Sequence, residues 1–197
     1  MHIVAEPSDA ADRPTNPPLF AALRADAGEL TRLKRRTYAG RTGAADVLTL
    51  PAFWCVVLWR LGNLWHARGL RALSRMSYVA NLVVFGADLA PGSVVGPGLV
   101  VPHPVGVACA TGTTIGARCR IMGRVAIGGS GSADRPGHPR IGDDVWVLDG
   151  VRIFGPVTVG SGSVIGTSVL LTQDVPPDTT VRVPSPVVEM RSRGGTR

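Results

Sequence analysis

Residues 141–171 read IGDDVWVLDGVRIFGPVTVGSGSVIGTSVLL, with an aliphatic residue at every sixth position. The same period runs back to Leu89, with one slip of two residues and one polar interruption. Its aliphatic positions are Leu89, Val95, Val101, Val107, Ile115, Ile121, Ile127, Ile141, Val147, Ile153, Val159 and Ile165. No α-helix has this period, and the glycine and proline content would break one. A short strand followed by a tight corner fits it, so the pattern predicts a β-helix of stacked hexapeptide coils.

Composition agrees with one compact molecule. Hydrophobic residues make up 45% of the chain but aromatic residues only 5%, as expected for a core of thin aliphatic layers. The formal net charge of +7 indicates either a solvated basic face or an anionic ligand. Since no recognition motif or basic stretch with interleaved aromatics points to nucleic acid, a phosphate-bearing cofactor is favoured.

The three cysteines are Cys55, Cys109 and Cys119, and they lack the CxxC spacing of a zinc site. Cys109 and Cys119 fall in the coil frame, where a buried thiol acts as a small apolar residue. This argues against a disulfide framework and for a reducing compartment, so we expect a cytoplasmic protein.

Helical periodicity precedes the coils, at Leu19–Arg35, Ala52–Ala67 and Leu70–Val84, with a link at Tyr38–Thr49. The apolar run Ala52–Trp59 is too short to span a bilayer, so no membrane segment is expected. The predicted organisation is a disordered leader (1–18), an α-helical segment (19–87), the β-helix (88–188) and a basic tail (189–197).

A polar segment, GGSGSADRPGHPR at 128–140, interrupts the coils. Glycine, serine, aspartate and proline cluster there, so it cannot continue the strand pattern. It is also too long for a corner turn, and we expect an extended loop. Loops of this length on a compact scaffold are often functional, although a tolerated insertion is the alternative.

Four separate motifs then carry a family resemblance: GADLAPGS at 86–93, VPHPVGVACATGTTIG at 101–116, AIGGSG with HPRIG at 126–142, and QDVPPDTT at 173–180. With the lead-in WRLGNLWHARGL, the chain from about Thr49 to Val188 resembles the serine O-acetyltransferase branch of the hexapeptide acyltransferases. The resemblance implies a left-handed β-helix, a homotrimer, and acetyl-CoA bound in clefts between subunits. From the cysteine and histidine positions, no metal is expected.

His103 and Asp88 are the candidate catalytic residues. Pro102 and Pro104 flank His103 and fix the backbone around it. A triangular coil of three hexapeptides repeats every eighteen residues, so Asp88, fifteen residues earlier, can lie near the same corner. A carboxylate that holds one imidazole nitrogen leaves the other free as a base. Both positions match the family's catalytic pair, although a surface histidine on a proline-rich corner is the alternative.

By resemblance, the CoA arm passes Gly129, Ser130, Asp149, Gly150, Thr167 and Arg182. Asp149 stands where the family has a small residue, and Arg182 where it has glycine. Arg182, with Arg191 and Arg193, is expected either to meet CoA phosphates or to be merely solvated. His103 would take a proton from the acceptor as it attacks the thioester, with no covalent enzyme intermediate.

The acceptor site departs from the family. The family has an aspartate directly before the catalytic histidine, where this chain has Pro102, and an arginine before the loop histidine, where it has Gly137. The family also has an acidic residue before the apolar helix, where this chain has Thr37. In the family, these charged residues recognise the amino and carboxyl groups of serine. The family's loop histidine is kept as His138. Arg135, two residues before Gly137, is expected to reach the substrate carboxylate that the family's arginine binds. Serine should therefore bind poorly. A modified amino acid, an amine, another hydroxyl compound or a sugar fits the missing charges better.

The family pairs its trimers into hexamers through a longer N-terminal helical domain, most of which has no counterpart here. The resemblance therefore implies a trimer that does not pair further. Two other functions stay open. One is a catalytically idle trimeric scaffold or binding protein. The other is a β-helical carbonic anhydrase, which would need three metal-binding histidines, whereas only His103 and His138 lie in the coil region.

Overall fold

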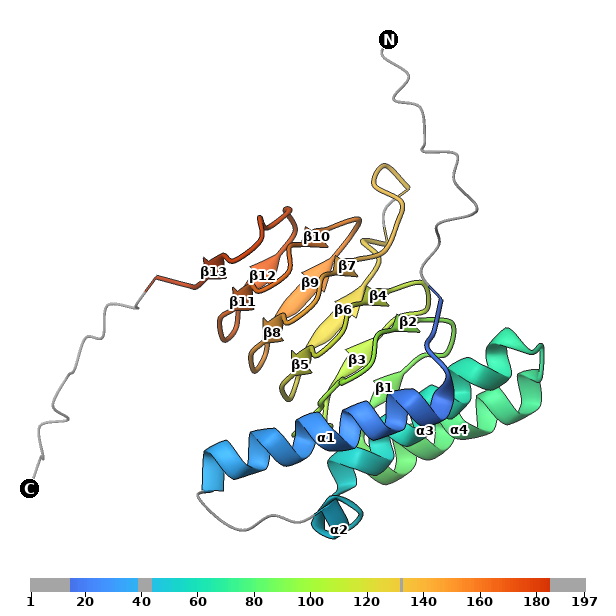
Figure 1. The fold of residues 1–197 in the computed structure, drawn as a ribbon. Helices are drawn as coiled ribbons and strands as arrows, with labels where there is room; N and C mark the ends of the chain where they lie inside the picture. Colours follow the sequence, from blue (N-terminus) through green and yellow to red (C-terminus); the bar gives the residue numbers. More distant parts are fainter. Residues whose placement is uncertain (1–14, 39–43, 132, 185–197) are drawn as a thin grey trace, which may run out of the picture.

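The computed structural model describes residues 15–38, 44–131 and 133–184. Over these residues the helices come first and the strands follow (Figure 1). The helices are α1 (Leu19–Tyr38), α2 (Ala44–Val47), α3 (Pro51–Ala67) and α4 (Arg71–Phe85). The strands are β1 (Asp88–Leu89), β2 (Val94–Val95), β3 (Ala108–Cys109), β4 (Thr114–Ile115), β5 (Arg120–Ile121), β6 (Ala126–Gly128), β7 (Arg140–Ile141), β8 (Trp146–Val147), β9 (Arg152–Phe154), β10 (Thr158–Val159), β11 (Val164–Ile165), β12 (Leu170–Leu171) and β13 (Thr180–Val181).

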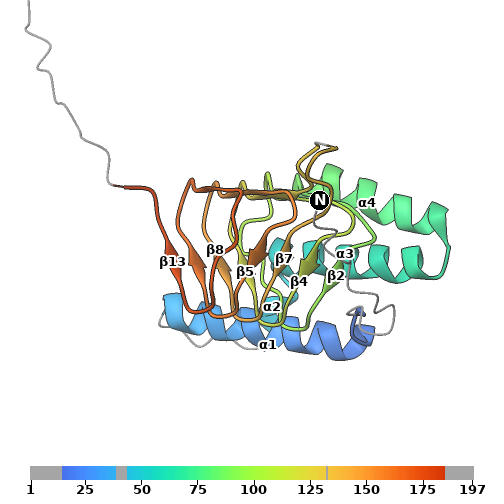
Figure 2. The ribbon, with the colours of Figure 1, turned by 90° about the horizontal axis from the view of Figure 1, so that it is seen from above.

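The strands form three parallel sheets, which are the faces of the predicted β-helix. The first sheet has the order β1-β3-β6-β9-β12, the second β10-β7-β4-β2, and the third β13-β11-β8-β5. Successive coils stack along one axis (Figure 2). The chain turns at corner 1 from the first sheet to the second, at corner 2 from the second to the third, and at corner 3 from the third back to the first. Corner 3 comprises residues 101–107, 122–125, 148–151 and 166–169, and Arg182, which directly follows β13, lies at the same edge beside Gly166.

The inward positions of the hexapeptide pattern form the core. All twelve aliphatic residues of the six-residue period are buried, and none is more than 3% exposed. Cys109 and Cys119 are buried in the same layers, as expected for small apolar residues. The slip in the period is the longer turn at 101–107, after the bridge between Val100 and Arg120. The hexapeptide prediction is therefore confirmed.

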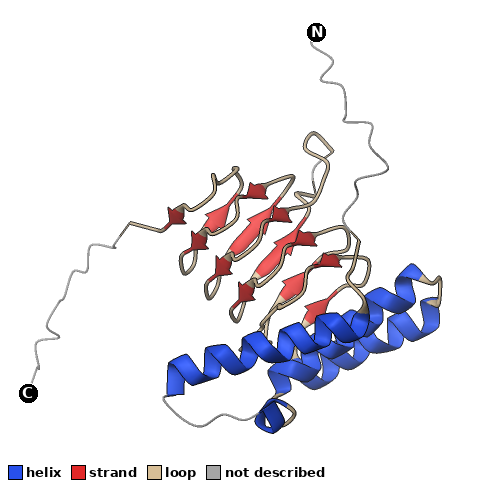
Figure 3. Cartoon of the chain, viewed as in Figure 1, coloured by secondary structure: helices blue, strands red, loops and turns tan. Residues whose placement is uncertain are grey.

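The helices cover one end of the β-helix, where α3 and α4 lie side by side against the first coil (Figure 3). Helix α1 lies along the flank of the coils (Figure 2). A buried ion pair fixes this arrangement: Arg60 of α3 donates two hydrogen bonds to Asp26 of α1, at 2.5 and 2.8 Å. No helix among the described residues is both long and apolar enough to cross a membrane.

Differences from the expected organisation lie near its boundaries. Helix α2 lies in the segment expected to be a link. It was not predicted, because four residues are too few to show a helical period. The expected leader is described from residue 15, and Asn16 bonds to the backbone of Ser93 and Val95, at 3.0 and 2.9 Å. Residues 1–14 and the basic tail, including Arg191 and Arg193, lie outside the described residues. The loop lies where expected, between β6 and β7.

Candidate active site

His103 lies at corner 3 of the first coil, and its side chain is exposed. Pro102 and Pro104 restrict the backbone on either side of it. The backbone N–H of Arg124, on the next coil, donates to the carbonyl of Val105 at 3.2 Å, which ties the long turn to the turn that follows. The imidazole is therefore carried on a rigid corner and directed to the outside of the coil.

Four of the residues expected along CoA follow His103 on the same corner, on later coils: Asp149, Gly150, Thr167 and Arg182. Backbone hydrogen bonds join the successive turns. The N–H of Gly150 donates to Gly123 at 3.0 Å, and the N–H of Ser168 donates to Asp149 at 2.9 Å. Corner 3 is thus a continuous edge of the prism, with His103 near the helical end and the expected CoA residues beyond it.

The other expected CoA residues, Gly129 and Ser130, begin the loop at corner 1, on the opposite edge of the first sheet. Within the loop, the hydroxyl of Ser130 donates to the carbonyl of Arg135 at 2.8 Å. Arg135 in turn donates from Nη2 to the carbonyl of Thr172 at 3.3 Å. In this conformation Arg135 secures the loop to the coil, so its expected contact with a substrate carboxylate stays a prediction.

His138, later in the same loop, stands over two glycines. A Cβ added to Gly112 would lie 2.8 Å from Cδ2 of the imidazole, and one added to Gly129 would lie 3.3 Å from its Cε1. Gly112 also has a φ of +85°, which glycine adopts without strain. These two glycines leave the space in which the His138 ring rests.

Asp88 begins the first sheet and lines a hollow of about 680 Å³ with His138, Cys109 and small residues of the sheet. Its carboxylate interacts with the hydroxyl of Tyr78 on α4 and raises the pKa of that hydroxyl. The single chain therefore brings Asp88 to Tyr78 and to the hollow of His138, whereas His103 lines a different cavity. The expected pairing of Asp88 with His103 stays a prediction.

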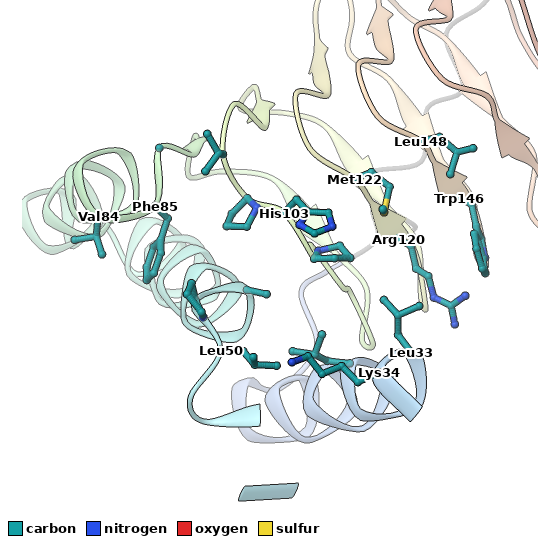
Figure 4. A pocket seen from close by; sticks show the side chains of 17 residues that line it. Leu33, Lys34, Leu50, Val84, Phe85, His103, Arg120, Met122, Trp146 and Leu148 are labelled. Carbon is teal, nitrogen blue, oxygen red and sulfur yellow. The ribbon is translucent and has the colours of Figure 1, made fainter. Parts of the chain in front are cut away.

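His103 opens onto a larger cavity of about 840 Å³, between the helices and the third sheet (Figure 4). Most of its lining is apolar, and the polar side chains are Lys34, His103 and Arg120. The apolar lining comprises Leu30, Leu33, Leu50, Pro51, Ala52, Val84, Phe85, Pro102, Pro104, Val105, Met122, Trp146 and Leu148. Among the described residues, no group of three or more histidine, cysteine or acidic side chains could hold a metal ion.

Arg120 is a further lining residue that was not expected from the sequence. A signal was present in the register: Arg120 and Trp146 each directly precede an inward aliphatic residue of the third sheet, and the two pair in β5 and β8. Such pairing stacks their side chains on the outer face of that sheet. The helices that close the cavity over them could not be placed from the period alone.

Known proteins resemble this chain in sequence. No family model matches the chain. It is 30% identical over 167 residues to the serine acetyltransferase of Mycobacterium tuberculosis, covering 84% of this chain and 73% of that protein. It is also 30% identical over 187 residues to the Escherichia coli K12 serine acetyltransferase, covering 94% and 66%. The chain belongs to the serine acetyltransferase family.

Solved structures of this family agree with that assignment. The serine acetyltransferase of Neisseria gonorrhoeae in complex with serine has a TM-score of 0.75 at 28% identity, over 84% of this chain and 67% of that one. The Brucella abortus enzyme in complex with coenzyme A has a TM-score of 0.74 at 27% identity, over 83% and 64%. These likenesses confirm the expected left-handed β-helix and, at the level of the family, the expected CoA-dependent acetyltransferase. The chain spans about two thirds of the length of most of these relatives.

Proposed function

We propose that the chain transfers an acetyl group from acetyl-CoA to a hydroxyl, or an amine, of a small acceptor, with His103 as general base. The observation that carries the proposal is the common edge: His103 and four residues expected along CoA share corner 3. The exposed imidazole is free to meet a substrate, and small residues such as Gly150 let backbone amides approach the pantetheine. The coenzyme A complex of the related Brucella abortus enzyme supports the same donor.

The chemistry needs one proton transfer and no covalent enzyme intermediate. His103 takes the proton of the acceptor hydroxyl as its oxygen forms a bond to the thioester carbonyl carbon. The tetrahedral intermediate collapses when the carbon–sulfur bond breaks, and the proton on the imidazole passes to the leaving CoA thiolate. Backbone N–H groups would stabilise the oxyanion in this step.

Asp88 is proposed as the group that orients the His103 ring. The two lie on neighbouring turns, because the N–H of Asp88 donates to Val107 at 2.8 Å, at the end of the His103 corner. Asp88→Asn should then lower kcat with little change in the KM for acetyl-CoA, whereas Tyr78→Phe should leave kcat within about twofold. If Asp88→Asn leaves kcat as little changed as Tyr78→Phe does, Asp88 stabilises the position of α4 and does not orient His103.

A homotrimer would complete the site. The first sheet separates the edge of His103 from the edge of His138, and its outer face carries small residues that are partly exposed in the single chain: Ala90, Ala108, Ala110 and Ala126. A second copy packed on this face would bring the loop of one copy to corner 3 of the next, and a closed three-fold ring repeats that contact. Light scattering should give three times the chain mass, and Ala108→Arg should abolish it.

Free, buried cysteines support a reducing location, such as the cytoplasm. Serine is among the acceptors to test, because the related Neisseria gonorrhoeae enzyme was solved with it. Pro102 and Gly137 nevertheless stand where the family has charged residues that would bind it.

The decisive experiment follows CoA release from acetyl-CoA with a panel of hydroxyl and amine acceptors, serine included. His103→Ala should lower kcat by at least about 100-fold, the usual contribution of a general base. His66→Ala is the matched control, because His66 lies at the exposed end of α3. Full activity in His103→Ala would overturn the base assignment. Absence of turnover and of acetyl-CoA binding would favour the idle scaffold.

A further inference from the structure

The polar side chains that line the large cavity beside His103 are all basic. Of the described residues, seventeen line the cavity, and these include three basic side chains, Lys34, His103 and Arg120, and no acidic one. An ammonium group placed in it would face the cations Lys34 and Arg120, and no carboxylate is among the described lining residues. The electrostatics of the lining therefore disfavour a zwitterionic amino acid and favour an anion.

Arg120 lines this cavity and makes no short ion pair with another described residue. Arg120 is 9% exposed, and its Nε is buried with no hydrogen-bond partner among the residues that the structure describes. Within the described part of the chain, the nearest carboxylate is that of Glu29, whose Oε2 lies 3.7 Å from Nη2. That is an ion pair but too long for a hydrogen bond. A buried donor without an acceptor is costly, so the guanidinium of Arg120 has hydrogen-bonding capacity that the described residues do not use.

The orientation of Arg120 is fixed by its neighbour in the sheet. Its guanidinium carbon lies 4.2 Å from the centroid of the Trp146 ring, so the cation is stacked on the indole. The guanidinium is drawn on the cavity side of the third sheet, toward α1 (Figure 4). A stacked guanidinium keeps its N–H groups in a plane, where they can meet both oxygens of a carboxylate.

We propose that Arg120 binds the anionic group of the acceptor, and that the acceptor is an apolar hydroxy acid. This rests on the proposed acetyl transfer at His103. The carboxylate lies at Arg120, the apolar body fills the space lined by Leu33, Phe85 and Met122, and the hydroxyl is presented to His103. A volume of about 840 Å³ is in the range of sites that enclose a small organic molecule.

The test uses a matched pair of acceptors, 3-hydroxyoctanoate and its methyl ester, with saturating acetyl-CoA, and serine as the zwitterion. The wild-type kcat/KM should favour the carboxylate over the ester by at least about 30-fold, as for a buried charged hydrogen bond. In Arg120→Met this ratio should fall to about threefold or less, and Arg120→Lys should give an intermediate ratio. Each ratio is taken within one preparation, so it does not depend on the fraction of folded protein.

Arg118→Met is the matched control and should keep the wild-type ratio. Arg118 lies on the same coil but at corner 2, where it is 47% exposed and paired with Asp144. Calorimetry of 3-hydroxyoctanoate and of its methyl ester with the wild-type protein gives a second readout that needs no variant. The carboxylate should bind more tightly than the ester by a similar factor.

Other outcomes separate this proposal from the proposed function. Turnover of serine with no preference for carboxylate over ester would overturn the acceptor class and leave acetyl transfer standing. Better use of octanoyl-CoA than acetyl-CoA, with the same lack of preference, would assign the cavity to the donor's acyl chain. Loss of turnover with every acceptor, together with Arg120-dependent binding of the carboxylate, would overturn acetyl transfer and keep the anion site. No turnover and no selective binding would overturn both.

Discussion

Asp26 of α1 and Arg60 of α3 form an ion pair whose side chains are 2% and 4% exposed. Both partners also bind the first coil. Arg60 donates to the carbonyls of Val95 and Gly96, at 3.0 and 2.7 Å, and Oδ1 of Asp26 accepts the N–H groups of Gly98 and Leu99, each at 2.8 Å. The pair therefore holds the helices on the coils and positions the α1 residues that line the large cavity.

Asp26→Ala should destabilise the fold by about 3–5 kcal/mol, because it leaves the buried guanidinium of Arg60 without its carboxylate. Chemical denaturation measures the free energy of unfolding. Asp144→Ala is the control: Asp144 is 52% exposed and paired with Arg118, so its loss should cost less than about 1 kcal/mol. Equal effects of the two substitutions would contradict the role assigned to the buried pair.

Glycines stack at corner 2, and their close approach predicts a steric requirement. A Cβ added to Gly116 would lie 2.4 Å from Oδ1 of Asp143 and 2.5 Å from the carbonyl carbon of Gly142. Since the latter is backbone, Gly116→Ala should cost about 1–3 kcal/mol of stability. Gly28 lies on the exposed face of α1, and apart from its own helix no atom of the described residues lies within 4 Å of such a Cβ. Gly28→Ala should therefore stabilise the helix by about 1 kcal/mol, and thermal unfolding of both variants checks the opposite signs.

Asp149 is held at corner 3 by Arg124, whose Nε lies 3.3 Å from Oδ1 of the carboxylate. If CoA passes along this corner, its phosphates meet a negative charge there. Asp149→Ser should then lower the KM for acetyl-CoA by about two- to fivefold, since an exposed pair is worth less than about 1 kcal/mol, and kcat should stay within about twofold.

The matched control for this prediction is Asp144→Ser. Asp144 pairs with Arg118 in a similar way, at 2.8 Å between Nε and Oδ1, but at corner 2. Its replacement should leave the KM for acetyl-CoA unchanged. A lower KM in both variants would mean that net charge, and not position on corner 3, governs CoA binding.

The cysteines should be unreactive in the folded protein. Burial raises the pKa of the Cys55, Cys109 and Cys119 thiols to about 12 each. At pH 8 only about one thiol in ten thousand would be ionised, and the thiolate is the reactive form. Iodoacetamide at pH 8 should therefore add no mass to the native protein within the time that alkylates all three thiols in denaturant. Rapid native labelling of one cysteine would show that its layer opens.

Much of the architecture could be predicted because the hexapeptide period is local and redundant. Ile141, Val147 and Ile153 are inward in the structure as the period requires, and the single slip before Ile115 is the long turn that carries His103. The loop before Arg140 was also recognisable, because its composition cannot form a coil. Helix α2 was missed, because a single turn gives no repeat from which to infer it.

The site was only partly predictable. Because equivalent positions of successive coils stack, Asp149 and Thr167 lie on the same corner as His103, as the repeat allows. The same counting could not decide the partner of Asp88, because Tyr78 comes from a helix whose docking angle leaves no mark on the period. Nor could it decide that Arg120 faces an apolar cavity, since Leu33 and Phe85 reach that cavity from two different helices.

By itself, the sequence determined the triangular coils, their corners and the presence of a rigid, outward-facing imidazole, because each depends on contacts between equivalent positions of adjacent repeats. Only the tertiary structure decided what lies opposite that imidazole. The helices dock on the coils through single contacts, such as Asp26 with Arg60, that no repeat encodes, and their docking encloses Nε of Arg120 without a hydrogen-bond partner among the described residues.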